Sequence, residues 1–142
     1  MLKQSLLALT IITISGCGGS SGGPAGVGSA ANKVSETSSE NDDIESAQSI
    51  PVNTQVTGRL NSDDDITDYY SINVPSPKTI TVELRATNVD FDLTLYDENT
   101  VSISYSSTLA GNESLTRHFS AGTYYFSVTA YQGSGPYTLL IN

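Results

Sequence analysis

The 142-residue sequence is poor in cysteine, histidine, tryptophan and basic residues. It contains one Cys, one His, no Trp, and 6 Lys and Arg residues against 15 Asp and Glu, which gives a net charge of −9. A single cysteine permits no internal disulfide. The acidic balance argues against nucleic acid or an anionic membrane surface as a partner, and it favours a cation.

Long apolar runs are missing as well. The longest extends from Leu6 to Ile14 and follows Lys3 near the N-terminus. A helix needs about twenty apolar residues to cross a hydrocarbon core, so this run is too short to span a membrane. The order of basic residue, apolar run and small residues is that of a secretory signal. We therefore predict that residues 1–16 are a signal peptide that is removed.

The end of this signal, Ile14-Ser15-Gly16-Cys17, resembles the bacterial lipobox. The resemblance implies that the Cys17 thiol receives a lipid and becomes the mature N-terminus, so that the acyl chains hold the protein on a membrane. The alternative is an ordinary signal peptide with an incidental cysteine. Gly18 follows the cysteine, and by the same resemblance it permits transfer to an outer membrane if the organism has one. The expected location is the cell envelope.

Residues 17–40 are predicted to be the lipidated cysteine and a flexible Gly/Ser linker. This segment has almost nothing to bury, and a coil of about 23 residues has a root-mean-square reach of roughly 25 Å. Residues 41–142 remain, which are enough for one domain with a single core.

The remaining sequence has the period of β-strands. From Val52 onward, apolar residues recur at every second position, and Gly, Pro, Asn and Asp clusters separate the runs. About eight short strands result, with no convincing helix. Apolar and polar faces alternate at this spacing in an antiparallel β-sandwich, so we predict an all-β, jelly-roll-like fold.

Several segments, taken in order, resemble the bacterial pre-peptidase C-terminal domain, which is related to the collagen-binding domains of clostridial collagenases. The resemblance covers about residues 40–142. Its motifs are Asn41-Asp42, Gly58-Arg59-Leu60, Asp65 to Ile72, Asp90 to Asp97, Ala121 to Tyr125, and Gly133 to Leu139. It implies a sandwich that binds or assists rather than catalyses.

The resemblance also implies a calcium site. Asn41, Asp42, Asp65 and Asp68 match the ligand positions of family members that bind calcium, an ion that takes six to eight oxygen ligands. Two further positions, acidic in the collagenase modules, are Thr37 and Ser39 here. Substitutes could come from Glu36, Glu40 or Asp43. The alternative is a solvated acidic surface, because nine acids lie between Glu36 and Asp68 with Arg59 as the single base.

Eight tyrosines offer large contact areas with a polar tip. By alternation, Tyr70, Tyr105, Tyr124 and Tyr137 point inward, Tyr69, Tyr96 and Tyr125 point outward, and Tyr131 lies at a turn. In the collagen-binding relatives, aromatic residues at positions matching Tyr70 and Tyr105 contact ligand, and a third matching position is Thr129. We therefore expect ligand contacts from Tyr70, Tyr105 and Tyr131. The alternative is that the tyrosines only pack.

Catalytic arrangements are poorly supported. His118 alternates with Phe119 in a predicted strand and is expected on its polar face. No Gly-x-Ser-x-Gly elbow occurs, and lipidation excludes Cys17 as a nucleophile. Asp90 and Asp92 have the spacing of any same-face pair on a strand, so a glycosidase reading is disfavoured. We predict that the protein is not an enzyme.

Two functions remain open. The first is a membrane-anchored binding or accessory module, stabilised by calcium, that engages an extracellular protein or polysaccharide. The second is a structural or accessory envelope lipoprotein that partners a separately encoded secreted protease.

Overall fold

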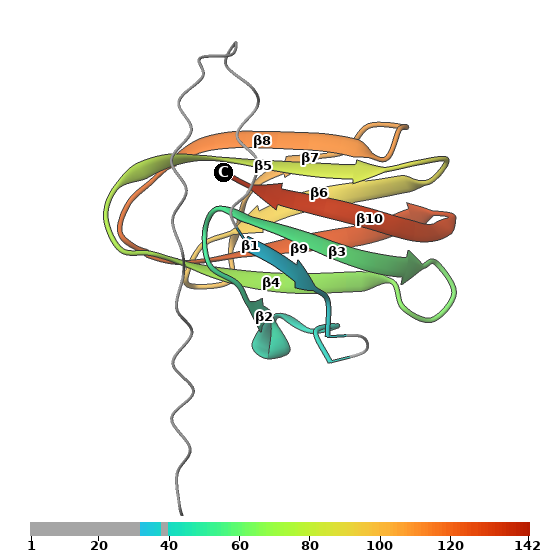
Figure 1. Ribbon diagram of the computed structural model, residues 1–142, viewed down its shortest axis with the longest axis horizontal. Helices are drawn as coiled ribbons and strands as arrows, with labels where there is room; N and C mark the ends of the chain where they lie inside the picture. Colours follow the sequence, from blue (N-terminus) through green and yellow to red (C-terminus); the bar gives the residue numbers. More distant parts are fainter. Residues whose placement is uncertain (1–31, 38–39) are drawn as a thin grey trace, which may run out of the picture.

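The computed structural model describes residues 32–37 and 40–142, which form two β-sheets packed face to face (Figure 1). In spatial order, sheet A contains β1 (Asn32–Ser35), β3 (Thr54–Asn61), β10 (Ser134–Ile141), β5 (Lys78–Ala86) and β8 (Asn112–Phe119). Sheet B contains β2 (Gln48–Ser49), β4 (Thr67–Val74), β9 (Gly122–Gln132), β6 (Asp90–Tyr96) and β7 (Ser102–Ser106). The predicted all-β sandwich is confirmed.

The described residues form ten strands, and β3 to β10 are the eight that the alternating pattern predicts. The two additional strands, β1 and β2, have only four and two residues and no apolar alternation of their own. They pair parallel to β3 and β4, whereas the other pairs are antiparallel. Strand β1 lies inside the range predicted as linker, so ordered structure begins before residue 41. The signal peptide, Cys17 and residues 18–31 lie outside the described residues.

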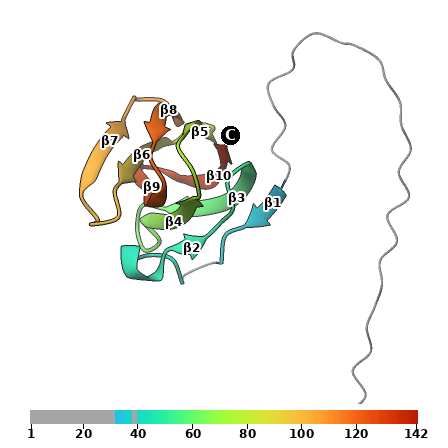
Figure 2. The ribbon, with the colours of Figure 1, turned by 90° about the vertical axis from the view of Figure 1, so that its left-hand side faces the viewer.

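The described residues between β1 and β2 (36–37 and 40–47) are called the strap here, and they include the short 3-10 helix η1 (Ile44–Ser46). The strap passes from sheet A to sheet B along one open edge of the sandwich, while β7 and β8 form the opposite edge (Figure 2). Among residues 32–37 and 40–142, no helix has the length and apolar character needed to cross a membrane.

The core follows directly from the alternation along each strand. Buried side chains include Leu93 and Leu95 on β6, Phe126 on β9 and Leu139 on β10, each fully excluded from solvent. Their polar neighbours in sequence face outward. Full burial of a side chain of this size stabilises the folded state by roughly 1.5–3 kcal/mol.

Two turns show how the sequence reverses the chain. After β6, the Asp97 carboxylate accepts hydrogen bonds from the backbone N–H groups of Asn99 and Val101, both at 2.9 Å. Between β9 and β10, Gly133 alone carries the chain from sheet B to sheet A with φ at 92°. Such a left-handed conformation costs glycine little.

Candidate metal centre and binding face

The strap and the β3–β4 loop bring three carboxylates together. One carboxylate oxygen from each of Asp42, Asp65 and Asp68 lies within 4.8 Å of the others. Asp42 comes from the strap, Asp65 from the loop and Asp68 from the first residues of β4. Residues 26 positions apart in sequence thus meet at one point, because β2 aligns the strap beside β4.

Asn41 is fixed against this group. It is fully buried, its carbonyl accepts a 2.7 Å hydrogen bond from the Tyr69 N–H, and its Nδ2 donates to the Tyr69 carbonyl at 3.4 Å. Within the described part of the chain, its Oδ1 has no hydrogen-bond partner. The buried Oδ1 of Asp65 has none either. Two buried oxygens without donors are costly unless a cation or water satisfies them.

These residues have the donor atoms that a hard cation such as calcium prefers. The three carboxylate oxygens lie within 4.8 Å of one another, so one ion can contact all of them. The set offers only oxygens and no nitrogen or sulfur, as a hard cation requires.

The base of the site is a hydrogen-bonded group that spans the two sheets. The Tyr137 hydroxyl on β10 donates to Asp68 Oδ2 at 2.5 Å, and the hydroxyls of Tyr70 and Tyr137 are 2.5 Å apart. Burial is the main cause that raises the pKa of Asp68 to about 8. The Tyr137 hydrogen bond opposes the shift, and Glu36 and Asp65 add to it. Without a metal, this carboxyl therefore holds a proton near neutral pH.

Glu36, one of the three acids expected as substitute ligands, lies beside the carboxylate group but is not a member of it. Its Oε2 accepts a hydrogen bond from the Arg59 N–H at 3.0 Å and lies 3.3 Å from the Tyr137 hydroxyl. Gly58 makes this possible, since a Cβ at position 58 would overlap the Glu36 carboxylate and the Tyr137 ring. The Gly58-Arg59-Leu60 motif thus has a structural reason.

The other two candidate substitutes are also outside the carboxylate group. Glu40 and Asp43 are exposed and are not part of the carboxylate group. The Thr37 N–H donates to the Gln48 side chain at 3.1 Å, which fixes the strap. Ser39 lies outside the described residues. Burial and the charges of Asp42, Glu36 and Asp64 raise the pKa of Asp65, as expected for acids gathered without a base.

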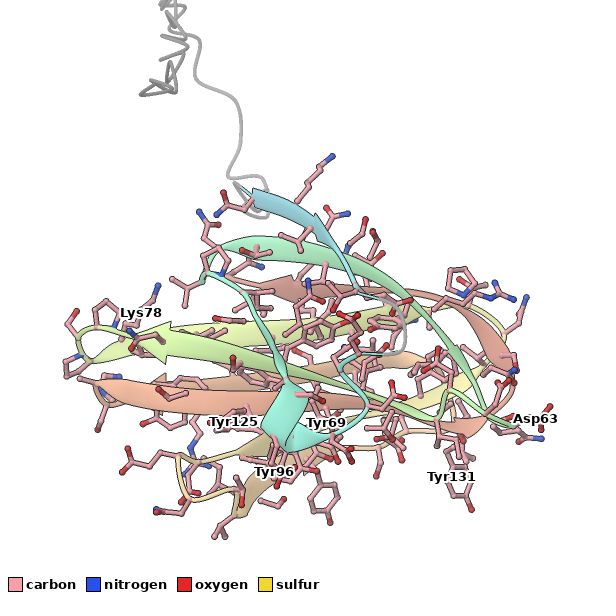
Figure 3. The ribbon with its side chains drawn as sticks, turned by 90° about the horizontal axis from the view of Figure 1, so that it is seen from below. Asp63, Tyr69, Lys78, Tyr96, Tyr125 and Tyr131 are labelled. Atoms are coloured by element: carbon pink, nitrogen blue, oxygen red, sulfur yellow. The ribbon has the colours of Figure 1, made fainter. Side chains whose placement is uncertain are left out.

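The β3–β4 loop is shaped by Asn61. Its backbone exchanges hydrogen bonds with Asp65 at 2.8 and 3.2 Å, and its side chain binds Asp64 Oδ1 at 2.6 Å and the Asp63 N–H at 3.1 Å. These contacts use Asp64 to hold the turn and direct Asp63 outward at the loop tip (Figure 3). Asp65 is left to face the carboxylate group.

A second feature is the outer face of sheet B, which we call the tyrosine face. It is formed by the outward residues of β4, β9, β6 and β7, and its tyrosines are Tyr69, Tyr96, Tyr125, Tyr105 and Tyr131. The rings of Tyr69 and Tyr96 have centroids 6.1 Å apart, and Tyr96 is the direct strand partner of Tyr125 (Figure 3). Tyr105 and Tyr131 are 72% and 74% exposed.

Two expectations about tyrosines are corrected. Tyr70 has no exposed surface and its hydroxyl belongs to the Asp68 group, so it cannot contact a ligand docked on the sandwich. Tyr105 does not point inward. It pairs with the outward residue Thr94 across the β6–β7 ladder, so the neighbouring serines of β7 face the interior instead.

The strands that form the tyrosine face contain no basic residues. All Lys and Arg residues in the described ranges lie on strands of sheet A, and the five strands of sheet B contain no Lys, Arg or His. The sheet A residues are Lys33, Arg59, Lys78, Arg85 and Arg117. Arg117 reaches the edge of this face from sheet A, where its Nη1 donates to the Ile103 carbonyl on β7 at 3.1 Å. The strands of the tyrosine face carry no basic residue of their own, which disfavours polyanions.

Comparison with known proteins supports the fold. Residues 66–130, from the start of β4 through most of β9, match the family described as the bacterial pre-peptidase C-terminal domain. Over 125 residues the chain is 26% identical to collagenase ColA of Clostridium perfringens (strain 13 / Type A). The match covers 81% of this chain but 11% of that protein, so the chain corresponds to about a tenth of its length.

Two solved structures share the fold. The pre-peptidase C-terminal domain of the Bacillus anthracis collagenase superposes with a TM-score of 0.61 and 27% identity over 68% of this chain and 94% of that one. PliG of Aeromonas hydrophila, a periplasmic inhibitor of g-type lysozyme, gives a TM-score of 0.51 at 14% identity, over 79% of this chain and 100% of that one. The second likeness concerns the fold alone.

Proposed function

We propose that the protein is a non-catalytic binding module at the cell envelope, anchored by lipid on Cys17 and stabilised by calcium. Its tyrosine face engages a protein or polysaccharide. The observation that carries this proposal is the exposure of Tyr105 and Tyr131 on one face whose strands contain no basic residue. Exposed aromatic rings are the side chains that most often contribute the largest share of binding energy at interfaces.

The geometry of the face suits an extended ligand. Tyr105 pairs with Thr94, and Thr129 pairs with Asp92 one step further along the sheet. Tyr131 follows Thr129 on the same side of β9. From strand spacing and rise, Tyr105 and Tyr131 are separated by about 16 Å across the sheet. A polymer segment lying over β7, β6 and β9 can therefore contact both rings.

Calcium would be held by Asp42, Asp65 and Asp68 with the Asn41 side-chain oxygen, and Glu36 lies next to the group. The calcium ion would supply positive charge that offsets the repulsion among these acids. The ion would join the strap to the β3–β4 loop and so fix the edge of the sandwich where the chain enters it. Its role is structural, because the site lies at this edge and not on the tyrosine face.

The anchor and tether fit this arrangement. Lipid on Cys17 and the residues up to Asn32 would connect the membrane to β1, which is the edge strand of sheet A. Sheet A carries the basic residues, and sheet B is the other layer. The tyrosine face is thus on the sheet that the tether does not enter.

Retention on insoluble polymers tests the proposal. The full chain is mixed with fibrillar collagen, chitin and cellulose in calcium, and bound and free protein are separated by centrifugation. We expect retention on at least one polymer and a loss of about tenfold or more in the Tyr105→Ala, Tyr131→Ala double variant. Arg85→Ala, on the outer face of sheet A, is the matched control. Failure to bind all three, or binding that the double substitution leaves unchanged, contradicts the proposal.

A second candidate is supported by the match to one tenth of a collagenase. In this alternative the protein assists a separately encoded secreted protease and has no affinity for external polymers. To test this alternative, the full chain is cross-linked to its neighbours in intact cells and then purified, and the attached proteins are identified. The protease should be recovered with the wild type at a stoichiometric level, and polymer retention should be absent.

A further inference from the structure

A surface hollow lies where the β7–β8 loop meets the tyrosine face. It has a volume of about 250 Å³, and its lining residues are Asp90, Asp92, Ser107, Thr108, Leu109 and Tyr131. None of these belongs to the calcium site. Tyr131 projects from the body of the sandwich at the same end as Asp63 (Figure 3).

The hollow has two strongly exposed apolar walls. Leu109 is 94% exposed and Tyr131 is 74% exposed. These are the highest exposed fractions among the large hydrophobic side chains that the structure describes. Large apolar groups held in water beside a concavity are typical of interaction surfaces.

The loop that presents Leu109 is held in place by a buried glutamate. Glu113 is 3% exposed, and its carboxylate accepts hydrogen bonds from the Thr108 N–H at 2.9 Å and the Thr108 hydroxyl at 2.6 Å. The Ser106 hydroxyl donates to the same carboxylate. A clamped loop loses little conformational entropy when a partner binds, so the hollow is already formed.

The floor of the hollow has unbalanced negative charge. Asp90 and Asp92 flank the buried Phe91 and therefore both point outward. Within residues 32–37 and 40–142, neither side chain makes a hydrogen bond or an ion pair, and no Lys, Arg or His lines the hollow. Burial and the charges of Asp90 and Glu113 raise the pKa of Asp92. A positive guest would remove this repulsion.

A metal ion is not the guest that fits. Among the described residues, the group of three carboxylates close enough to share an ion is that of Asp42, Asp65 and Asp68. Asp90 and Asp92 offer two carboxylates beside an aromatic ring and a leucine. That combination suits an organic cation, whose charge pairs with the acids while its flat or aliphatic part packs on the ring.

We propose that this hollow is a subsite for an arginine side chain of a polypeptide partner. The guanidinium lies between Asp90 and Asp92 with one face on the Tyr131 ring, and an apolar neighbour in the partner packs on Leu109. This inference rests on the proposed binding face and names its partner as a polypeptide. A neutral sugar would leave the two charges unpaired and would have little use for Leu109.

The test uses small probes and the full chain in calcium. Amide signals of the ¹⁵N-labelled protein are followed by NMR during titration with N-acetyl-arginine amide, and then with N-acetyl-citrulline amide, which has nearly the same shape but no charge. We expect saturable shifts centred on Asp90, Asp92, Leu109 and Tyr131 with arginine, and affinity at least about tenfold weaker with citrulline. Equal shifts with both probes, or none with arginine, overturn the subsite.

Two variants locate the effect. Asp92→Asn should abolish the arginine response, whereas Asp63→Asn, an exposed acid at the loop tip, should leave it unchanged. Loss in both would mean that only overall charge matters and would overturn the subsite. Shifts at the hollow with cellohexaose but not with arginine would assign it to a polysaccharide instead. If arginine binds as expected and no polymer is retained, the subsite stands and the wider proposed function fails.

Discussion

Tyr137 on sheet A donates a 2.5 Å hydrogen bond to Asp68 on sheet B, so the two layers of the sandwich are joined at the base of the acidic site. This contact connects the packing of the core to the chemistry of the site. Asp68 holds a proton without a metal and would lose it to bind one. Several measurable consequences follow from this link.

Removing the Tyr137 hydroxyl should weaken both fold and site. Tyr137→Phe leaves Asp68 without its donor, and a lost hydrogen bond to a buried group costs about 1–3 kcal/mol in unfolding free energy. The pKa of Asp68 should rise further, because the Tyr137 hydrogen bond lowers it. Urea unfolding and calcium titration measure the two effects. Tyr125→Phe, on the tyrosine face, is the control, and equal behaviour of the two variants would contradict the link.

Stability in a chelator should decrease as pH rises. Asp68 has a pKa of about 8 when folded and about 3.9 when unfolded, so the folded state binds the extra proton between these values. Stability from this group is complete below pH 4 and is lost as pH rises through 8. Thermal unfolding in EDTA should show a decrease of at least about 5 °C from pH 5 to pH 8.

Saturating calcium should reverse that trend, since the ion replaces the proton on Asp68. The melting temperature should then stay level or rise over the same pH range. Asp68→Asn should remove most of the pH dependence in the chelator. A pH-independent melting temperature of the wild type in EDTA would show that Asp68 is not protonated.

Gly58→Ala should disrupt the site from the strand below it. The added Cβ would overlap the Glu36 carboxylate and the Tyr137 ring, and overpacking of this kind costs about 1–3 kcal/mol. Gly135→Ala is the matched control on β10, because its Cβ would meet Val89 Cγ1 at an ordinary 3.4 Å. Chemical denaturation of both variants should separate them clearly. Similar denaturation midpoints of the two variants would mean that lack of room for a Cβ does not explain the glycine at position 58.

Glu113→Gln should loosen the β7–β8 loop. The amide presents a donor where the carboxylate now accepts bonds from Ser106 and Thr108, so at least one buried pair is lost. We expect faster hydrogen exchange at residues 107–111 and little change in sheet B. Glu98→Gln, in an exposed turn, should have no effect. Unchanged exchange in Glu113→Gln would show that the loop is held by other contacts.

The sequence predicted strands well where one face is buried. In β3, β4, β5, β6, β9 and β10, alternating residues form the core, and the period is visible without a structure. Strands β1 and β2 could not be predicted in this way, because they are short and show no apolar alternation. They pair with β3 and β4, and Val34 is the β1 side chain that packs, partly buried, against the core.

Edge strand β7 shows the limit of alternation. Its large residue Tyr105 faces outward, while Ser106 turns inward and binds the buried Glu113. At this edge the interior is partly polar, so the rule that large residues point inward fails. The expectation for Tyr70 fails for the opposite reason: its position in the core excludes the ligand contact that family resemblance implies.

The acidic site was predicted from resemblance, and the structure places Asp42, Asp65 and Asp68 within reach of one ion, with Asn41 beside them. From the sequence, Glu36 was one of three acids, with Glu40 and Asp43, that could lie at this site. Its position depends on the parallel pairing of β1 with β3, which carries residue 36 to Gly58 and Tyr137.

Calorimetric titration of calcium into the metal-free full chain, with parallel thermal unfolding, tests the central claim most directly. The account predicts binding of one ion, and a rise of about 10 °C or more in melting temperature when calcium exceeds its dissociation constant a hundredfold. Asp65→Asn should abolish both effects, and Asp63→Asn should preserve them. Neither heat nor a rise in melting temperature in the wild type, or full binding in Asp65→Asn, would contradict a calcium-stabilised module.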